Sequence, residues 1–62
     1  MNNFKINDRV WHISMTDKVI RSTIIEVASF HVRIKTDSGN FFFIHKTEVN
    51  KIKHMPNYLL IK

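Results

Sequence analysis

The sequence predicts an all-β fold, a small antiparallel barrel of five strands. β-Branched and aromatic residues, which favour strands, dominate between Val10 and Ile44. Apolar residues do not recur at the i, i+3, i+4 spacing of an amphipathic helix over any long window. The stretch His31–Thr36 instead alternates strictly between two kinds of side chain. These observations favour strands throughout, interrupted only by turns.

Three strands are expected before the chain's only glycine. The first is Arg9–Ile13, which is followed by a loop rich in turn-forming residues, Ser14–Asp17. The second, Lys18–Val27, is long enough to bend and serve both halves of a barrel, with Ser22 as the expected bend point. The third strand begins at His31.

The hairpin that follows carries the clearest pattern. Val32 and Ile34 point to one side of their strand, which must be the core, and the basic residues between them point outward. Asp37–Asn40 is a turn, because it holds the only glycine. The expected register pairs Thr36 with Phe41, Lys35 with Phe42, Ile34 with Phe43 and Arg33 with Ile44. In that register Phe42 and Ile44 lie on the outer face, and Phe41 and Phe43 on the core face.

The end of the chain is expected to close the barrel. A single helical turn starts at Thr47, and a short strand follows around Lys51–Lys53. Pro56 then separates the barrel, residues 1–55, from an apolar tail, residues 56–62. The apolar part of this tail, Tyr58–Ile61, is expected to pack back on the barrel or to form a homodimer with another copy. The expected core comprises Val10, Ile24, Val27, Val32, Ile34, Phe43, Val49 and Ile52.

Composition restricts the partners. The 62 residues form one small domain, and the absence of cysteine removes disulfides and zinc–thiolate sites as sources of stability. Ten Lys and Arg against five Asp and Glu leave a formal charge of +5, which favours an anionic partner, although lysine can also serve solubility alone. No signal-peptide pattern and no stretch near the ~20 apolar residues of a membrane span is present, so a cytoplasmic protein without membrane contact is expected.

The succession of "INDRVWHI", a long "STIIEV" strand, a "VRIKTDSGNFFF" hairpin and "KTEVNKI" resembles the small SH3-like barrels. These include the KOW and Tudor-like groups and many short bacterial and phage proteins, and the resemblance covers Phe4 to Lys53. In such barrels glycine often occupies the positions held here by Asn7 and Ser22, and Asn is the commonest substitute where φ is positive. The resemblance implies a binding fold without a catalytic motif, and it leaves the ligand open.

Catalytic chemistry is not expected. The five acidic residues do not form a local pair, and the four histidines show no short metal-ligand spacing. His31 and His45 would lie across the open end of the hairpin, but the expected register puts them on opposite faces. The prediction is therefore a protein that is not an enzyme and that has no metal site and no cofactor.

The outer face of the hairpin is the candidate site. Alternating basic residues beside aromatic rings suit single-stranded DNA or RNA, because phosphates pair with cations while bases stack on the rings. The same residue types also anchor protein interfaces, so an acidic protein surface is the alternative partner, as for a phage- or plasmid-type module that binds and inhibits or regulates a host protein. The candidate binding residues are Trp11, His31, Arg33, Lys35 and Phe42.

Overall fold

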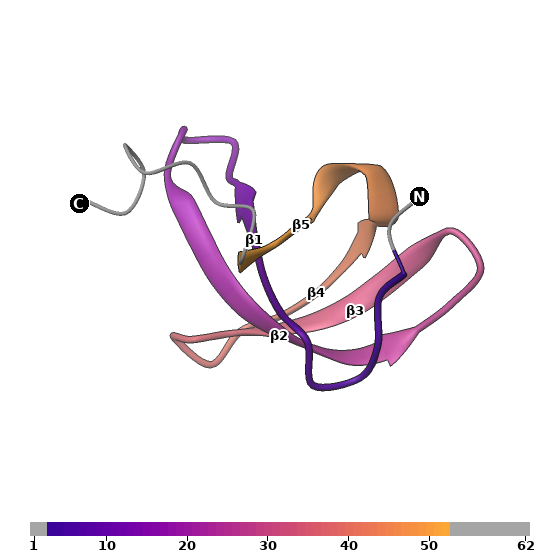
Figure 1. Ribbon diagram of the computed structural model, residues 1–62. Helices are drawn as coiled ribbons and strands as arrows, with labels where there is room; N and C mark the ends of the chain where they lie inside the picture. Colours follow the sequence, from indigo (N-terminus) through magenta and orange to yellow (C-terminus); the bar gives the residue numbers. More distant parts are fainter. Residues whose placement is uncertain (1–2, 53–62) are drawn as a thin grey trace.

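The structure is a computed structural model, and it describes residues 3–52. One antiparallel sheet of five strands, in the order β4-β3-β2-β1-β5, forms the molecule (Figure 1). The elements are β1 Arg9–Ile13, β2 Val19–Val27, β3 His31–Thr36, β4 Phe41–His45, the 3-10 turn η1 Lys46–Glu48 and β5 Asn50–Lys51. In the described range no hydrogen-bonded ladder joins β4 to β5, so the sheet is open between its two edge strands. The expected tail interaction of Tyr58–Ile61 lies outside the described residues.

The strand predictions for the first half of the chain are confirmed. β1 and β3 have the expected bounds, and β2 begins one residue later than expected, at Val19. Asn7 has the positive φ, 77°, that was expected from the resemblance to barrels with glycine at this position. The bend in β2 is not at Ser22, which pairs regularly and is buried. The irregularity lies between Ile24 and Glu26, where a bulge adds one residue to the long curved strand visible in Figure 1.

The core lies on the inner, concave side of the sheet. Its buried members are Phe4, Val10, Ile24, Val32, Ile34 and Val49, with Ile44 packed against them. Five of the eight expected core residues are thus confirmed. Val27 and Phe43 are exposed, contrary to expectation, and Ile52 is half-buried. Phe4 was missed because it precedes the first strand and belongs to no alternating pattern.

The register of the β3–β4 hairpin differs from the expected one by a single residue. The turn has three residues, closed by hydrogen bonds from the amide of Thr36 to the carbonyl of Asn40, 2.7 Å, and from the amide of Gly39 to the carbonyl of Thr36, 2.9 Å. Gly39 has a φ of 96°, the conformation that lets a three-residue loop close. The expected loop had four residues, and a shift of one residue exchanges the two faces of a strand.

The corrected pairs are Lys35 with Phe41, Ile34 with Phe42, Arg33 with Phe43, Val32 with Ile44 and His31 with His45. The predicted position of Phe42 and Ile44 on the outer face is therefore wrong, and they lie on the inner side with Val32 and Ile34. The single helical turn expected after the hairpin is confirmed, but its first residue and its cap differ from the prediction. The 3-10 turn begins at Lys46, and the side chain of His45, not that of Thr47, caps it by accepting a hydrogen bond from the Thr47 amide at 3.1 Å.

Candidate functional site

The candidate site is the outer face of the β3–β4 hairpin, which is called the basic-aromatic face below. It consists of three cross-strand pairs, Lys35–Phe41, Arg33–Phe43 and His31–His45. Each pair places a basic or imidazole side chain of β3 directly opposite an aromatic ring of β4. Because side chains on one face of a strand repeat every second residue, the alternation of β3 and the new register of β4 together produce this arrangement.

The rings of this face are open to solvent. Phe41 is 60% exposed and Phe43 is 57% exposed, which is unusual for phenylalanine in a monomeric domain. The Lys35 ammonium lies 5.7 Å from the centre of the Phe41 ring, within the range of a cation–π contact. A shallow depression of about 310 Å³ lies here, lined by Ile25, Arg33 and the three phenylalanines of β4.

The histidine end of the face is an aromatic cluster. The His31 ring stacks on the Phe43 ring with centroids 4.9 Å apart and planes 16° apart, and it meets the His45 ring edge-on at 5.0 Å. The expectation that His31 and His45 face opposite sides is therefore wrong, for the same register reason. In residues 3–52 no group of three or more His, Cys, Asp or Glu side chains is placed to hold a metal ion. Within that range, the imidazoles of His31 and His45 therefore lack a third side chain with which to coordinate a metal ion.

The electrostatics of the face depend on which cations are already paired. Arg33 contacts the carboxylate of Glu26 at 3.5 Å, and both side chains are about half exposed. Lys35 has no acidic partner within 4 Å in the described part of the chain, nor has Arg21 of β2. Arg21 extends the positive region on the same side of the sheet, because its neighbours Ser22 and Ile24 alternate inward. Alternation along β2 is the signal in the sequence that identifies Arg21 as an outward-facing cation.

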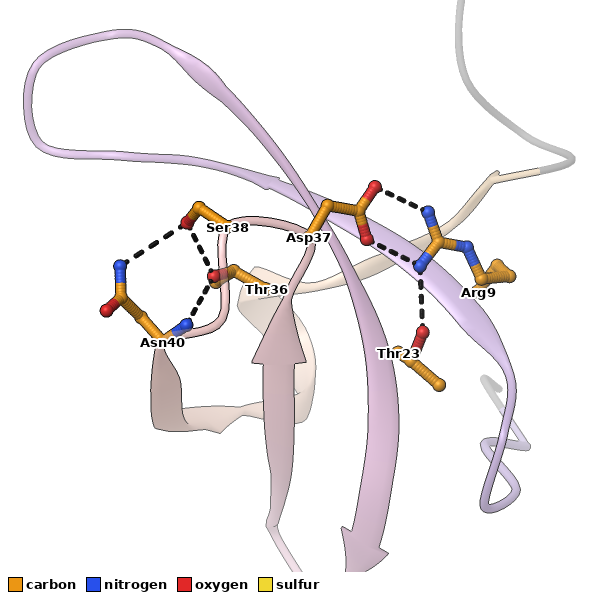
Figure 2. A network of polar contacts seen from close by, with 6 residues as sticks. All are labelled: Arg9, Thr23, Thr36, Asp37, Ser38 and Asn40. Atoms are coloured by element: carbon orange, nitrogen blue, oxygen red, sulfur yellow. Dashed lines mark hydrogen bonds and ion pairs between the residues drawn. The ribbon is translucent and has the colours of Figure 1, made fainter.

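Arg9 forms an ion pair with the hairpin turn. Its guanidinium donates two hydrogen bonds to the Asp37 carboxylate, at 2.7 and 2.8 Å, and a third to the Thr23 hydroxyl at 2.8 Å (Figure 2). The hydrogen bonds from Arg9 lower the pKa of the Asp37 carboxyl below its usual value. On the other side of the turn, the Thr36 hydroxyl accepts a hydrogen bond from the Asn40 amide at 2.9 Å and contacts the Ser38 hydroxyl (Figure 2). These bonds fix the turn that sets the register.

Trp11 lies on the same side of the sheet as the basic-aromatic face, but on β1, with β2 between it and β3. Its ring is half-buried, and its indole Nε1 is covered without a hydrogen-bond partner in the described residues. Four of the expected site residues, Trp11, His31, Arg33 and Lys35, therefore share one side of the sheet. Phe42 is the exception. The rings that sequence reasoning missed are Phe41 and Phe43, because a run of three phenylalanines carries no period of its own.

Phe42 lies on the inner side of the sheet, where it also lines a groove with a volume of about 680 Å³. Other lining residues are His12, Thr36, Ile44 and Glu48. Burial lowers the pKa of His12, and the nearby Glu48 carboxylate only partly opposes this, so the imidazole is neutral at neutral pH. The groove thus presents apolar surface, neutral polar groups and the carboxylate of Glu48, in contrast to the cations on the outer face.

Comparison of the chain with protein-family models, with curated proteins and with solved structures found no match in any of the three. No helix in the described part of the chain has the length and apolar character needed to cross a membrane.

Proposed function

We propose that the protein is a small cytoplasmic, non-catalytic module that binds single-stranded nucleic acid, DNA or RNA, through the basic-aromatic face. The observation that carries this proposal is the direct opposition of Lys35 to Phe41 and of Arg33 to Phe43, with both rings more than half exposed. Stacking of bases on exposed rings beside phosphate-binding cations is the usual way that proteins hold single strands. We also propose an SH3-like fold, which is supported by the five antiparallel strands and by the single helical turn before the last strand.

The spacing of the rings favours a single strand over a duplex. Phe41 and Phe43 are two residues apart on β4, so their attachment points are separated by about 6.6–6.8 Å along the strand. Stacked bases in a duplex rise only about 3.4 Å per nucleotide. Two neighbouring bases can therefore occupy the two rings only if they are unstacked from each other, which an extended single strand permits.

The aromatic half of the proposal is tested by alanine substitutions in β4. Phe41→Ala and Phe43→Ala should each weaken binding of a labelled oligothymidine or oligouridine by about 1–3 kcal/mol, as measured by fluorescence anisotropy. Phe30→Ala is the matched control, because Phe30 is a phenylalanine that is 70% exposed but lies outside both strands of the face and outside the depression. Equal losses in all three variants would contradict the assignment of the face.

The electrostatic half is tested by salt. Changing both Arg33 and Lys35 to Gln should reduce the slope of log affinity against log salt by about 1.4, since each phosphate contact contributes about 0.7 on a single strand. The phenylalanine variants should leave this slope unchanged. If no single-stranded or duplex nucleic acid binds at low salt, the proposal fails. Salt-insensitive binding of an acidic protein would then favour the protein-partner alternative.

A further inference from the structure

The open edge of β4 is a feature that nucleic-acid binding does not explain. Among residues 3–52, β4 has a ladder partner on one side only, β3, and its three phenylalanines are 60%, 50% and 57% exposed. The run Phe41–Ile44 contains no charge, no proline and no glycine. Proteins normally protect an edge strand with such residues, because its unpaired backbone groups can bind another strand. An unprotected edge of this kind therefore points to strand pairing.

The backbone groups that face this edge follow from the hairpin's hydrogen bonds. The ladder is closed at its ends by the bond from the Thr36 amide to the Asn40 carbonyl and by the bond from the Lys46 amide to the Phe30 carbonyl. In an antiparallel ladder, hydrogen-bonded and non-hydrogen-bonded pairs alternate. Phe42 and Ile44 therefore bond to β3. The amides and carbonyls of the other β4 residues, Phe41, Phe43 and His45, point away from β3.

We propose that β4 pairs in antiparallel fashion with β4 of a second copy of the chain, with Phe43 opposite Phe43. In this register all five residues of β4 take part in the ladder. Each residue whose amide and carbonyl point away from β3 lies opposite a residue of the same kind in the second copy, so that the two can exchange hydrogen bonds. The register is symmetric, so the assembly closes as a dimer. The other edge of the sheet, β5, has only two residues and offers a much shorter partner.

Charge and side-chain matching also favour a second copy. β4 carries no Lys, Arg, Asp or Glu, so the contact opposes no like charges directly, even though each chain has a formal charge of +5. The nearest cations, on β3, lie one strand further from the two-fold axis. On the inner face Phe42 would lie opposite Ile44 of the second copy, an apolar pair, and on the outer face Phe41 would lie opposite His45. The two basic-aromatic faces would form one continuous surface and remain open.

Hydrogen exchange tests the proposal on the unaltered protein. In the dimer the amides of Phe41 and Phe43 become hydrogen-bonded, so their exchange should slow about tenfold or more as the protein concentration rises from about 10 μM to about 1 mM. The amides of Phe42 and Ile44, which bond to β3 in either state, are the internal control and should not change. Sedimentation equilibrium should show a dimer over the same range. A monomer throughout, or a dimer in which Phe41 and Phe43 exchange as fast as before, would overturn the proposal, as would a larger assembly.

Two substitutions at one position separate the backbone from the side chain. Phe43→Pro removes an amide that β3 does not use, so circular dichroism should show a folded protein while the dimer is lost. Phe43→Ala keeps that amide and should retain at least part of the dimerisation. If Phe43→Pro dimerises as well as the unaltered protein, the β4 edge is not the interface. Should Phe43→Pro fail to fold, the exchange pattern of the unaltered protein decides alone.

Discussion

β3 and β4 are neighbouring strands of one hairpin, yet burial alternates along one and not along the other. In β3 the inner residues Val32 and Ile34 are fully buried and the outer ones are exposed or half-buried. In β4 the inner residue Phe42 is half exposed, little less than its outer neighbours Phe41 and Phe43. β3 is flanked on both sides by strands, whereas no described strand pairs with the second side of β4. Position in the sheet, and not hydrophobicity, therefore decides how much of a residue is buried.

The two strands also differ in what their side chains contribute, since those of β3 stabilise the fold and those of β4 are available for binding. The aliphatic residues of β3 contribute to the core, and the larger phenylalanines of β4 leave about half of their surface in water. Retaining so much exposed aromatic surface has no advantage for stability. Its presence on the strand that carries the proposed site and the proposed dimer edge suggests a role in recognition.

The largest difference between the two strands should appear on truncation of their inner residues. Ile34→Ala should lower the free energy of unfolding by about 2–5 kcal/mol, because Ile34 is fully buried and a cavity would remain. Phe42→Ala removes a larger side chain but should cost under about 2 kcal/mol, because half of that side chain is already hydrated. Urea denaturation at one pH measures both. A larger loss for Phe42→Ala would show that the β4 ring is part of the core after all.

A medium effect is expected at the residue that sets the register of β4 against β3. Gly39 has a φ of 96°, and a Cβ added there would meet nothing within 4 Å, so Gly39→Ala carries only a backbone penalty. We expect a loss of about 1–2 kcal/mol. Gly39→Asn is the matched control and should be less destabilising, because Asn tolerates positive φ better than other residues. If the two variants are equally stable, backbone conformation at this position does not control the turn.

The same turn explains how far the sequence could predict the molecule. A period of two reveals the faces of β1 and β3, where polar and apolar residues alternate, and it gave the positions of Val10, Val32 and Ile34 correctly. It reveals nothing in "FFFI", where every residue is apolar, so the faces of β4 depended on the loop length alone. A three-residue and a four-residue loop fit "DSGN" equally well at the level of composition. The basic residues of the site were therefore predictable, whereas its aromatic residues required the hydrogen bonds of the turn.

The smallest expected effect concerns the ion pair that ties this turn to β1. Asp37 accepts two hydrogen bonds from Arg9, but both side chains are about half exposed, so Asp37→Asn should cost at most about 1 kcal/mol at neutral pH and less in high salt.

The pH dependence of stability gives the sharper signature of this ion pair. The pKa of Asp37 is lowered from 3.8 by the hydrogen bonds from Arg9, so the unfolded state binds a proton more readily than the folded state does. The contribution of Asp37 is complete above pH 3.8 and is lost as the pH falls from there through the folded-state pKa. Thermal unfolding between pH 5 and pH 2 should therefore show a shallower acid decline in Asp37→Asn than in the unaltered protein. Glu26→Gln is the control, because Glu26 makes one longer contact, 3.5 Å, with Arg33 and should change the decline less. If Glu26→Gln flattens the acid decline as much as Asp37→Asn does, the two-bond geometry with Arg9 gives Asp37 no special role in the pH dependence.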